Sequence, residues 1–318
     1  MGEDIMLQVA RQVLQDNLGL QAGEQLLVIE DETTLKIGEA LFAAGAQLGA
    51  RALLLRIQPL GRSGAEPPEA VARAMGAADV VIAATAHSLT HTQAKKAACA
   101  AGVRVATMPG ITEEMFFAGP ITADYNRVAA LTRKIADLLS SAEEATLEKD
   151  GRRLRLSLRG RKGIASTGVY RERGASGNLP SGEAYIAPVE GSAEGVVIVD
   201  GSFAGLGRPA APLKLTFTRG MLTAVEGPDG ERLLNLLGDD PQARNLAELG
   251  IGTNDKARIT GVILEDEKAY GTVHVALGSN DTFGGRVAAG IHVDGVIKAP
   301  DLYIDGRKVL SGGRILLD

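Results

Sequence analysis

Short apolar runs alternate with amphipathic, helix-like patterns over the first 145 residues. The runs typical of buried strands are 24–31 (EQLLVIED), 50–57 (ARALLLRI), 78–84 (ADVVIAA) and 103–108 (VRVATM). Apolar residues recur at helical spacing in 5–17, 33–49, 68–75 and 90–101, and again in a long helix near 125–145. Strands that alternate with helices in this way predict a doubly wound parallel sheet, so we expect a Rossmann-like or flavodoxin-like α/β domain over 1–145.

The pattern changes near residue 146. Polar and apolar positions alternate on both sides of Asp150-Gly151, which is a strong hairpin signal. Further strand-like runs are 195–203, 213–227 and 295–309, while 230–238 and 240–249 suggest one or two helices. The sequence therefore predicts a β-rich α+β domain over 146–318, with a closing hairpin at Asp305-Gly306.

Composition narrows the class of protein. The chain has 318 residues, of which 45% are hydrophobic, enough for two cores. It contains no run of 18 apolar residues, and its acidic start does not resemble a signal peptide, so we expect neither a membrane span nor export. Cys99 is the single cysteine, which excludes a disulfide within the chain and a thiolate metal cluster. These features favour a cytoplasmic protein.

Charge argues against a nucleic-acid partner. The net charge is −5, acidic and basic residues are interspersed, and aromatic residues make up only 3% of the chain. The one basic run, 152–162 (RRLRLSLRGRK), alternates with leucines and is more typical of an amphipathic strand with one solvated face than of a phosphate-binding patch.

Two of the four histidines, His274 and His292, lie in apolar runs that are rich in β-branched residues, and Asp294 follows the second. Side chains at i and i+2 of a strand share a face about 7 Å apart, so His292 and Asp294 could reach one ion. An imidazole and a carboxylate suit zinc, cobalt, manganese or ferrous iron. A hydrogen-bonded pair without a metal satisfies the same spacing, and His274 alone could be a core residue.

The other two histidines, His87 and His91, lie between a predicted strand and the next helix. One interpretation is a helix start capped by Ser88 or Thr90 with solvated imidazoles. The other is that His91 exchanges a proton with a substrate. Two glutamates also have unusual settings, because Glu183 and Glu248 lie in glycine-flanked, apolar segments. Each either faces water or is neutralised by a cation.

Four motifs occur in order over residues 176–300: NLPSGEAYIAP, NLAELGIGTN, DEKAYGTVHVALGS and IHVDGVI. In this region the chain resembles a short variant of the thermophilic metalloaminopeptidase family, the aminopeptidase T and aminopeptidase S group often labelled leucyl aminopeptidase. The resemblance implies a homodimeric hydrolase that releases N-terminal residues from peptides. It also implies two divalent ions, zinc, cobalt or manganese, that activate a water molecule.

The resemblance places the metal ligands residue by residue. The positions that match are Glu183, Glu248, Glu267, His274, His292 and Asp294. Glu248 or Asp294 would bridge the ions, Glu265 is the alternative to Glu267, and Glu248 and His91 are the catalytic candidates. One position departs from the family pattern, because Asp281 stands where the family has a tyrosine that assists catalysis.

Two other functions fit the same residues. The ring-cleaving dihydroxypyridine dioxygenases look like relatives of the peptidase family. His274, His292 and Asp294 supply the two-histidine, one-carboxylate set that ferrous iron prefers, with His91 as an acid–base residue. A binding protein that uses a metal only for stability is the third hypothesis. In each case the partner is a peptide or a small molecule.

Overall fold

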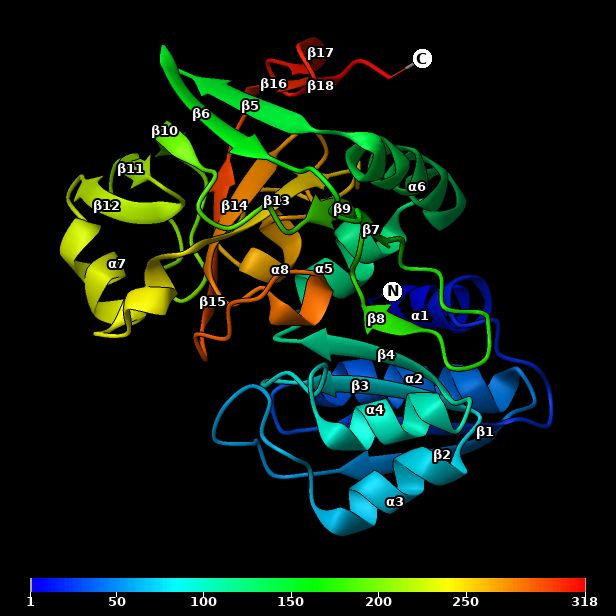
Figure 1. The fold of residues 1–318 in the computed structure, drawn as a ribbon. Helices are drawn as coiled ribbons and strands as arrows, with labels where there is room; N and C mark the ends of the chain where they lie inside the picture. Colours follow the sequence, from blue (N-terminus) through cyan, green and yellow to red (C-terminus); the bar gives the residue numbers. More distant parts are fainter. Residues whose placement is uncertain (1, 318) are drawn as a thin grey trace. The chain divides into compact units, whose positions relative to one another are not determined.

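The computed structural model describes residues 2–317. The chain divides into two compact units, each built around its own sheets (Figure 1). The N-terminal unit comprises the chain up to Arg127 together with the segment Gly168–Ser181. The C-terminal unit comprises Val128–Thr167 and the chain from Gly182 onward.

The N-terminal unit contains a five-stranded sheet. Its strands are β1 (Gln25–Glu30), β2 (Arg51–Arg56), β3 (Val80–Thr85), β4 (Arg104–Pro109) and β8 (Ser176–Asn178). The order is β2-β1-β3-β4-β8, and every neighbouring pair is parallel. Because the chain winds outward in both directions from β1 and β3, this is a doubly wound sheet, and the predicted fold class of this region is confirmed.

Helices cover both faces of this sheet. They are α1 (Gly2–Gln12), η1 (Val13–Asn17), α2 (Leu35–Gln47), α3 (Glu69–Ala77), α4 (Gln93–Ala100), α5 (Glu113–Ala118) and η2 (Pro120–Thr122). Helices α3 and α4 share an apolar cluster with one face of β1, β3 and β4, while α1 packs against α2. Among residues 2–317, no helix combines the length and the apolar character needed to cross a bilayer.

The C-terminal unit contains two antiparallel sheets. The first has the order β12-β11-β10-β6-β5-β16-β17-β18 and the second the order β15-β14-β13-β9-β7. The strands of the first are β5 (Glu144–Lys149), β6 (Arg152–Ser157), β10 (Glu194–Val199), β11 (Leu213–Thr218), β12 (Met221–Glu226), β16 (Asp301–Ile304), β17 (Arg307–Ser311) and β18 (Arg314–Ile315). Those of the second are β7 (Ile164–Ser166), β9 (Glu183–Ile186), β13 (Leu246–Gly252), β14 (Val273–Gly278) and β15 (His292–Ile297).

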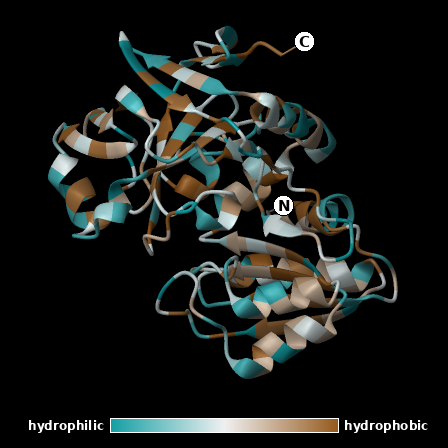
Figure 2. Cartoon of the chain, viewed as in Figure 1, coloured by the Kyte–Doolittle hydropathy of each residue, from teal (hydrophilic) through white to brown (hydrophobic). Residues whose placement is uncertain are grey.

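The helices of this unit are few and mostly short. They are α6 (Tyr125–Ser141), which begins at the end of the N-terminal unit, α7 (Gly230–Leu237), η3 (Pro241–Arg244), α8 (Ile263–Asp266) and η4 (Asp281–Phe283). The apolar faces of the two sheets contribute to one hydrophobic core. Along β6, Leu154 and Leu156 are buried in that core while the arginines beside them are exposed, and Figure 2 shows the banding along this hairpin. The amphipathic strand predicted from the basic run is therefore confirmed.

Two sequence-based expectations differ from the structure. The segment 240–249 is not a helix beyond η3, because it enters β13, where Gly250 and Gly252 disfavour helix and pairing with β9 and β14 fixes an extended backbone. The expected division at 145/146 also differs, since most of α6 belongs to the C-terminal unit and β8 returns to the N-terminal sheet.

Candidate metal centre

One face of the antiparallel sheet β15-β14-β13-β9-β7 carries the ionisable side chains. In β14, alternate residues face opposite sides, so Val273, Val275 and Leu277 enter the hydrophobic core while His274 faces the other way. The pairing register of the strands places four more ionisable residues on the same face as His274: Glu183, Glu248, His292 and Asp294. The paired positions are Glu183 with Gly252, Gly250 with His274, Glu248 with Ala276, Ala276 with Asp294, and Gly278 with His292.

Small residues lie between the groups that meet. Glu248 on β13 and Asp294 on β15 are separated by β14, where Ala276 is the residue in register with both. His274 on β14 and Glu183 on β9 are separated by β13, which has glycine at 250 and 252. A Cβ atom on Gly250 would lie 1.9 Å from Nε2 of His274, so only glycine leaves room for the imidazole in this position.

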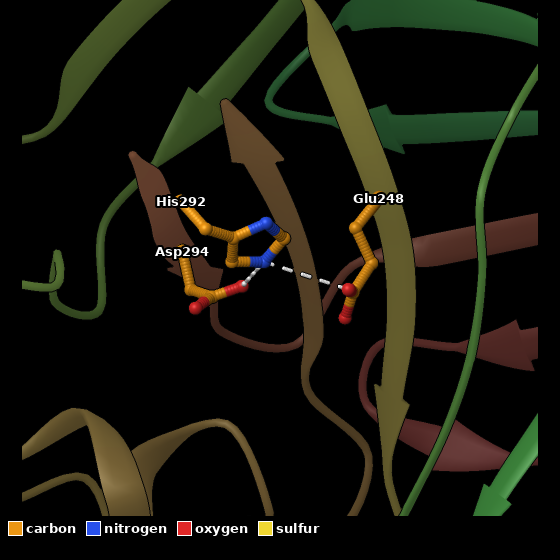
Figure 3. Close-up of side chains that lie close together, drawn as sticks. All are labelled: Glu248, His292 and Asp294. Atoms are coloured by element: carbon orange, nitrogen blue, oxygen red, sulfur yellow. Dashed lines mark hydrogen bonds and ion pairs between the residues drawn. The ribbon is translucent and has the colours of Figure 1, made fainter. Parts of the chain in front are cut away.

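The outer end of the cluster is formed by Glu248, His292 and Asp294 (Figure 3). Nε2 of His292 lies 3.2 Å from Oδ1 of Asp294 and 3.5 Å from Oε2 of Glu248. Nδ1 of His292 lies 2.8 Å from the carbonyl oxygen of Ser279, which accepts its hydrogen bond when Nδ1 carries the proton. That bond leaves Nε2 directed at the two carboxylates, the arrangement that metal-binding histidines use.

The inner part of the cluster is buried. His274 is fully buried, and its Nε2 lies 3.2 Å from Oε1 of Glu248 and 3.4 Å from Oε2 of Glu183. The other oxygen of Glu183 accepts a 2.7 Å hydrogen bond from Nζ of Lys268, which also contacts Glu267. Acidic and basic groups therefore alternate in one continuous chain of contacts. Its order is Asp294, His292, Glu248, His274, Glu183, Lys268 and Glu267.

These contacts shift the protonation of both histidines. Burial alone would lower the pKa of His274, but its hydrogen bond to Glu248 and the charges of Glu183, Glu248 and Asp294 raise this pKa to about 9. Burial opposes protonation of His292 as well. The charge of Asp294 and its hydrogen bond, together with Glu248, raise the pKa of His292 to about 10. Without a metal, both imidazoles are therefore cationic at neutral pH.

The charge of the cluster matches a divalent cation. Four carboxylates and one ammonium leave a formal charge of −3 when both imidazoles are neutral. Two imidazole protons, or one divalent ion, change this charge to −1. Donor atoms of Glu248, His292 and Asp294 all lie within 4.8 Å of one another. Nitrogen and carboxylate donors at this separation fit a divalent transition metal, which would displace the two protons.

The structure brings together all six residues that the resemblance marked as ligands. Glu265, the alternative to Glu267, is buried elsewhere and interacts with Arg258. The expected catalytic residue His91 belongs to the N-terminal unit, where its side chain is exposed on the turn between β3 and α4. Asp281 opens η4 and is also exposed.

Sequence reasoning missed Lys268 and an aromatic neighbour of the centre. Lys268 ends the acidic stretch Glu265-Asp266-Glu267, and a charge run of this kind usually faces solvent. The ring of Phe283 lies edge-on to His292 with centroids 5.7 Å apart, and Tyr185 lies edge-on to Phe283 at 5.6 Å. Tyr185 shares the sheet face of the cluster, a placement that period-two alternation within NLPSGEAYIAP would have indicated.

A buried cluster of imidazoles and carboxylates on an antiparallel sheet, in a chain that also has a doubly wound unit, is an arrangement typical of metal-dependent enzymes. The chain belongs to the 2,5-dihydroxypyridine 5,6-dioxygenase family, whose model matches residues 5–317. A curated relative with that name from Pseudomonas putida is 25% identical over 268 residues, which cover 78% of this chain and 73% of the relative.

Two solved structures share the fold. The 2,5-dihydroxypyridine dioxygenase from Pseudomonas putida matches with a TM-score of 0.80 and 20% identity, covering 98% of this chain and 97% of that one. Wild-type AmpT from Thermus thermophilus matches with a TM-score of 0.75 and 20% identity over the full length of both chains. The resemblance to aminopeptidase T is therefore confirmed as a likeness of fold.

Family membership overturns the expected activity. The aminopeptidase prediction, and with it the assignment to hydrolases and proteases, is wrong, because the family model and the curated relative are dioxygenases. The error has a structural reason. The four motifs lie on the sheet that carries the charge cluster, and the AmpT structure has the same fold, so these motifs do not separate the two activities. The departure at Asp281 was the residue-level signal against a peptidase.

Gly250→Ala tests the steric requirement for His274. The added methyl group displaces the imidazole, so we expect affinity for Mn²⁺, measured by titration calorimetry, to fall about 10- to 100-fold. Gly76→Ala is the matched control, since a Cβ at that position on α3 meets nothing within 4 Å. Equal Mn²⁺ affinity in Gly250→Ala and the wild type would contradict the role of this glycine.

The raised histidine pKa values predict how the metal-free protein responds to pH. A folded-state pKa above the unfolded value of about 6.5 stabilises the fold fully below that value, and the contribution is lost as pH rises through the folded pKa. The free energy of unfolding in urea with a chelator should therefore fall between about pH 6.5 and pH 10. His292→Gln should show a smaller fall. An identical fall in both proteins would assign the effect to other groups.

Proposed function

We propose that this chain is a ring-cleaving dioxygenase that acts on a dihydroxylated pyridine and uses one ferrous ion. The observation that carries the proposal is that both imidazoles contact Glu248 and that Asp294 contacts His292, in a chain that the dioxygenase family model matches from residue 5 to 317. The substrate class is the one in the names of the family and of its relative from Pseudomonas putida.

The residues that would hold the ion are His274, His292 and Asp294, with Glu248 between the two imidazoles. A two-histidine, one-carboxylate set with open positions is the donor set that non-haem ferrous oxygenases use to activate dioxygen. A second ion of zinc, cobalt or manganese is not part of this proposal. The carbonyl of Ser279 would fix the orientation of His292 by accepting its Nδ1–H.

The exposed edge of the centre suits a flat aromatic substrate. His292 is 30% exposed, whereas His274 is fully buried, so access to the ion runs over His292. Phe283 lies edge-on to that imidazole, and Tyr185 lies beside Phe283. An aromatic wall of this kind favours offset or edge-to-face packing of a pyridine ring, which a peptide backbone does not offer.

His91 is proposed as an acid–base residue of the same reaction. Its imidazole is exposed, and imidazole is the side chain best suited to exchange protons with a hydroxylated ring near neutral pH. The homodimer that the family resemblance implied stays a prediction.

Anaerobic loading with Fe²⁺, followed by oxygen-consumption assays on 2,5-dihydroxypyridine, tests the function. We expect turnover with Fe²⁺ but not with Zn²⁺, and two labelled oxygen atoms in the product from ¹⁸O₂. Asp294→Asn should lower activity and iron affinity by at least the roughly 10- to 100-fold that is typical when a residue supporting a metal ligand is lost. Asp301→Asn on β16, which removes an ion pair with Lys308, is the matched carboxylate control. Absence of oxygen uptake by iron-loaded wild type on dihydroxypyridines would refute the proposal.

His91→Gln separates proton transfer from metal binding. Loss of a general acid or base typically lowers kcat about 100- to 10,000-fold. Iron content should stay at the wild-type level, because the clustered donors all belong to the C-terminal unit. A variant with unchanged kcat across the pH range would remove His91 from the reaction.

A further inference from the structure

The ammonium of Lys268 is buried at the inner end of the cluster. The side chain is 1% exposed, and Nζ contacts both Glu183 and Glu267. Lysine is almost never fully buried unless its charge is paired, because moving an ammonium out of water costs several kcal/mol. The contacts of the ammonium with the two glutamates must therefore offset this cost.

The backbone fixes Lys268 from both sides. Its N–H donates to the carbonyl of Glu265 at 3.0 Å, and its carbonyl accepts from the N–H of Asn254 at 2.9 Å. Asn254 is itself fully buried. These two hydrogen bonds fix the backbone of Lys268 next to the C-terminal end of α8. If the side chain turned towards solvent, the two carboxylates would lose their cationic partner.

Those two carboxylates need a positive charge. Glu183 turns one oxygen to His274 and the other to Lys268, and Glu267 contacts the same ammonium. Nζ of Lys268 lies 2.7 Å from Oε1 of Glu183 and also contacts Glu267, so the ammonium is the counter-ion of this pair.

Two glutamates next to a histidine are also a donor set for a divalent metal. Carboxylates and an imidazole bind zinc, cobalt and manganese, and Glu183 and Glu267 are among the ligand positions that the aminopeptidase resemblance implies for a two-ion centre. In this chain the same oxygens are already occupied by Nζ of Lys268. An ammonium and a divalent ion cannot share one set of oxygens, because like charges at contact distance repel strongly in a buried site.

We propose that Lys268 is a resident cation that replaces a second metal ion and so limits the centre to one divalent ion. This proposal rests on the proposed single-ion function, and it names Lys268 as the reason that the centre holds only one ion. It also divides the cluster by role: His274, His292 and Asp294, with Glu248 between the imidazoles, face the exchangeable ion, whereas Glu183 and Glu267 hold the built-in charge.

Lys268→Met tests this inference, since methionine has a similar length and no charge. We expect the wild type, dialysed with excess Mn²⁺ and analysed by plasma mass spectrometry, to hold one ion per chain, and Lys268→Met to hold two. Adding Glu267→Gln to Lys268→Met should return the count to one. Lys308→Met, which removes a lysine paired with Asp301 outside the cluster, should keep one ion.

Each outcome decides the question independently of catalysis. Two ions in the wild type, or one in folded Lys268→Met, would overturn the proposal. If Lys268→Met folds only with Mn²⁺, as judged by circular dichroism, the proposal is supported, because a metal ion then replaces the ammonium. A variant that stays unfolded even with excess Mn²⁺ overturns it, since no ion takes that position. Failure of the dioxygenase assay would leave these metal counts unaffected.

Discussion

Four clustered carboxylates, three on one sheet face and Glu267 just after α8, must be neutralised, and the C-terminal unit is arranged around that requirement. Asp294, Glu248, Glu183 and Glu267 alternate with two imidazoles and one ammonium, so each acid has a cationic partner within contact distance. Burial makes an unpaired charge costly, and it also strengthens every pair that forms. The protein meets this requirement with one fixed cation and with a site whose positive charge can be exchanged between protons and a metal.

The charged groups can meet only because the residues on the strands between them are small, so residue size matters here as much as charge. Neighbouring strands lie about 4.8 Å apart, so side chains two strands apart meet only when the strand between them carries little bulk. Ala276 and Gly250 provide that space, while the opposite face of the same strands is filled by valine, leucine and isoleucine from the core. The alternation that builds the core therefore also builds the site.

Much of this arrangement could be predicted from the sequence. Periodicity located the parallel sheet of the N-terminal unit, and the motifs located every acid and histidine of the cluster. The helix expected near 240–249 failed because tertiary pairing overrode local propensity in a segment with two glycines. Lys268 could not be predicted, because a lysine after three acids is buried here only through contacts with Glu183, far away in the chain. The activity could not be predicted either, since a peptidase and a dioxygenase share this fold.

The path of the chain has a consequence for dissecting the molecule. The segment Gly168–Ser181 leaves the C-terminal unit after β7, adds β8 to the parallel sheet beside β4, and then returns as β9, which carries Glu183. No single cut therefore separates the two units. A fragment ending before β7 lacks an edge strand of the N-terminal sheet, and a fragment starting after β8 lacks β7, the strand that pairs with β9. The two units are interwoven along the chain, so truncation at one point will not release either unit intact.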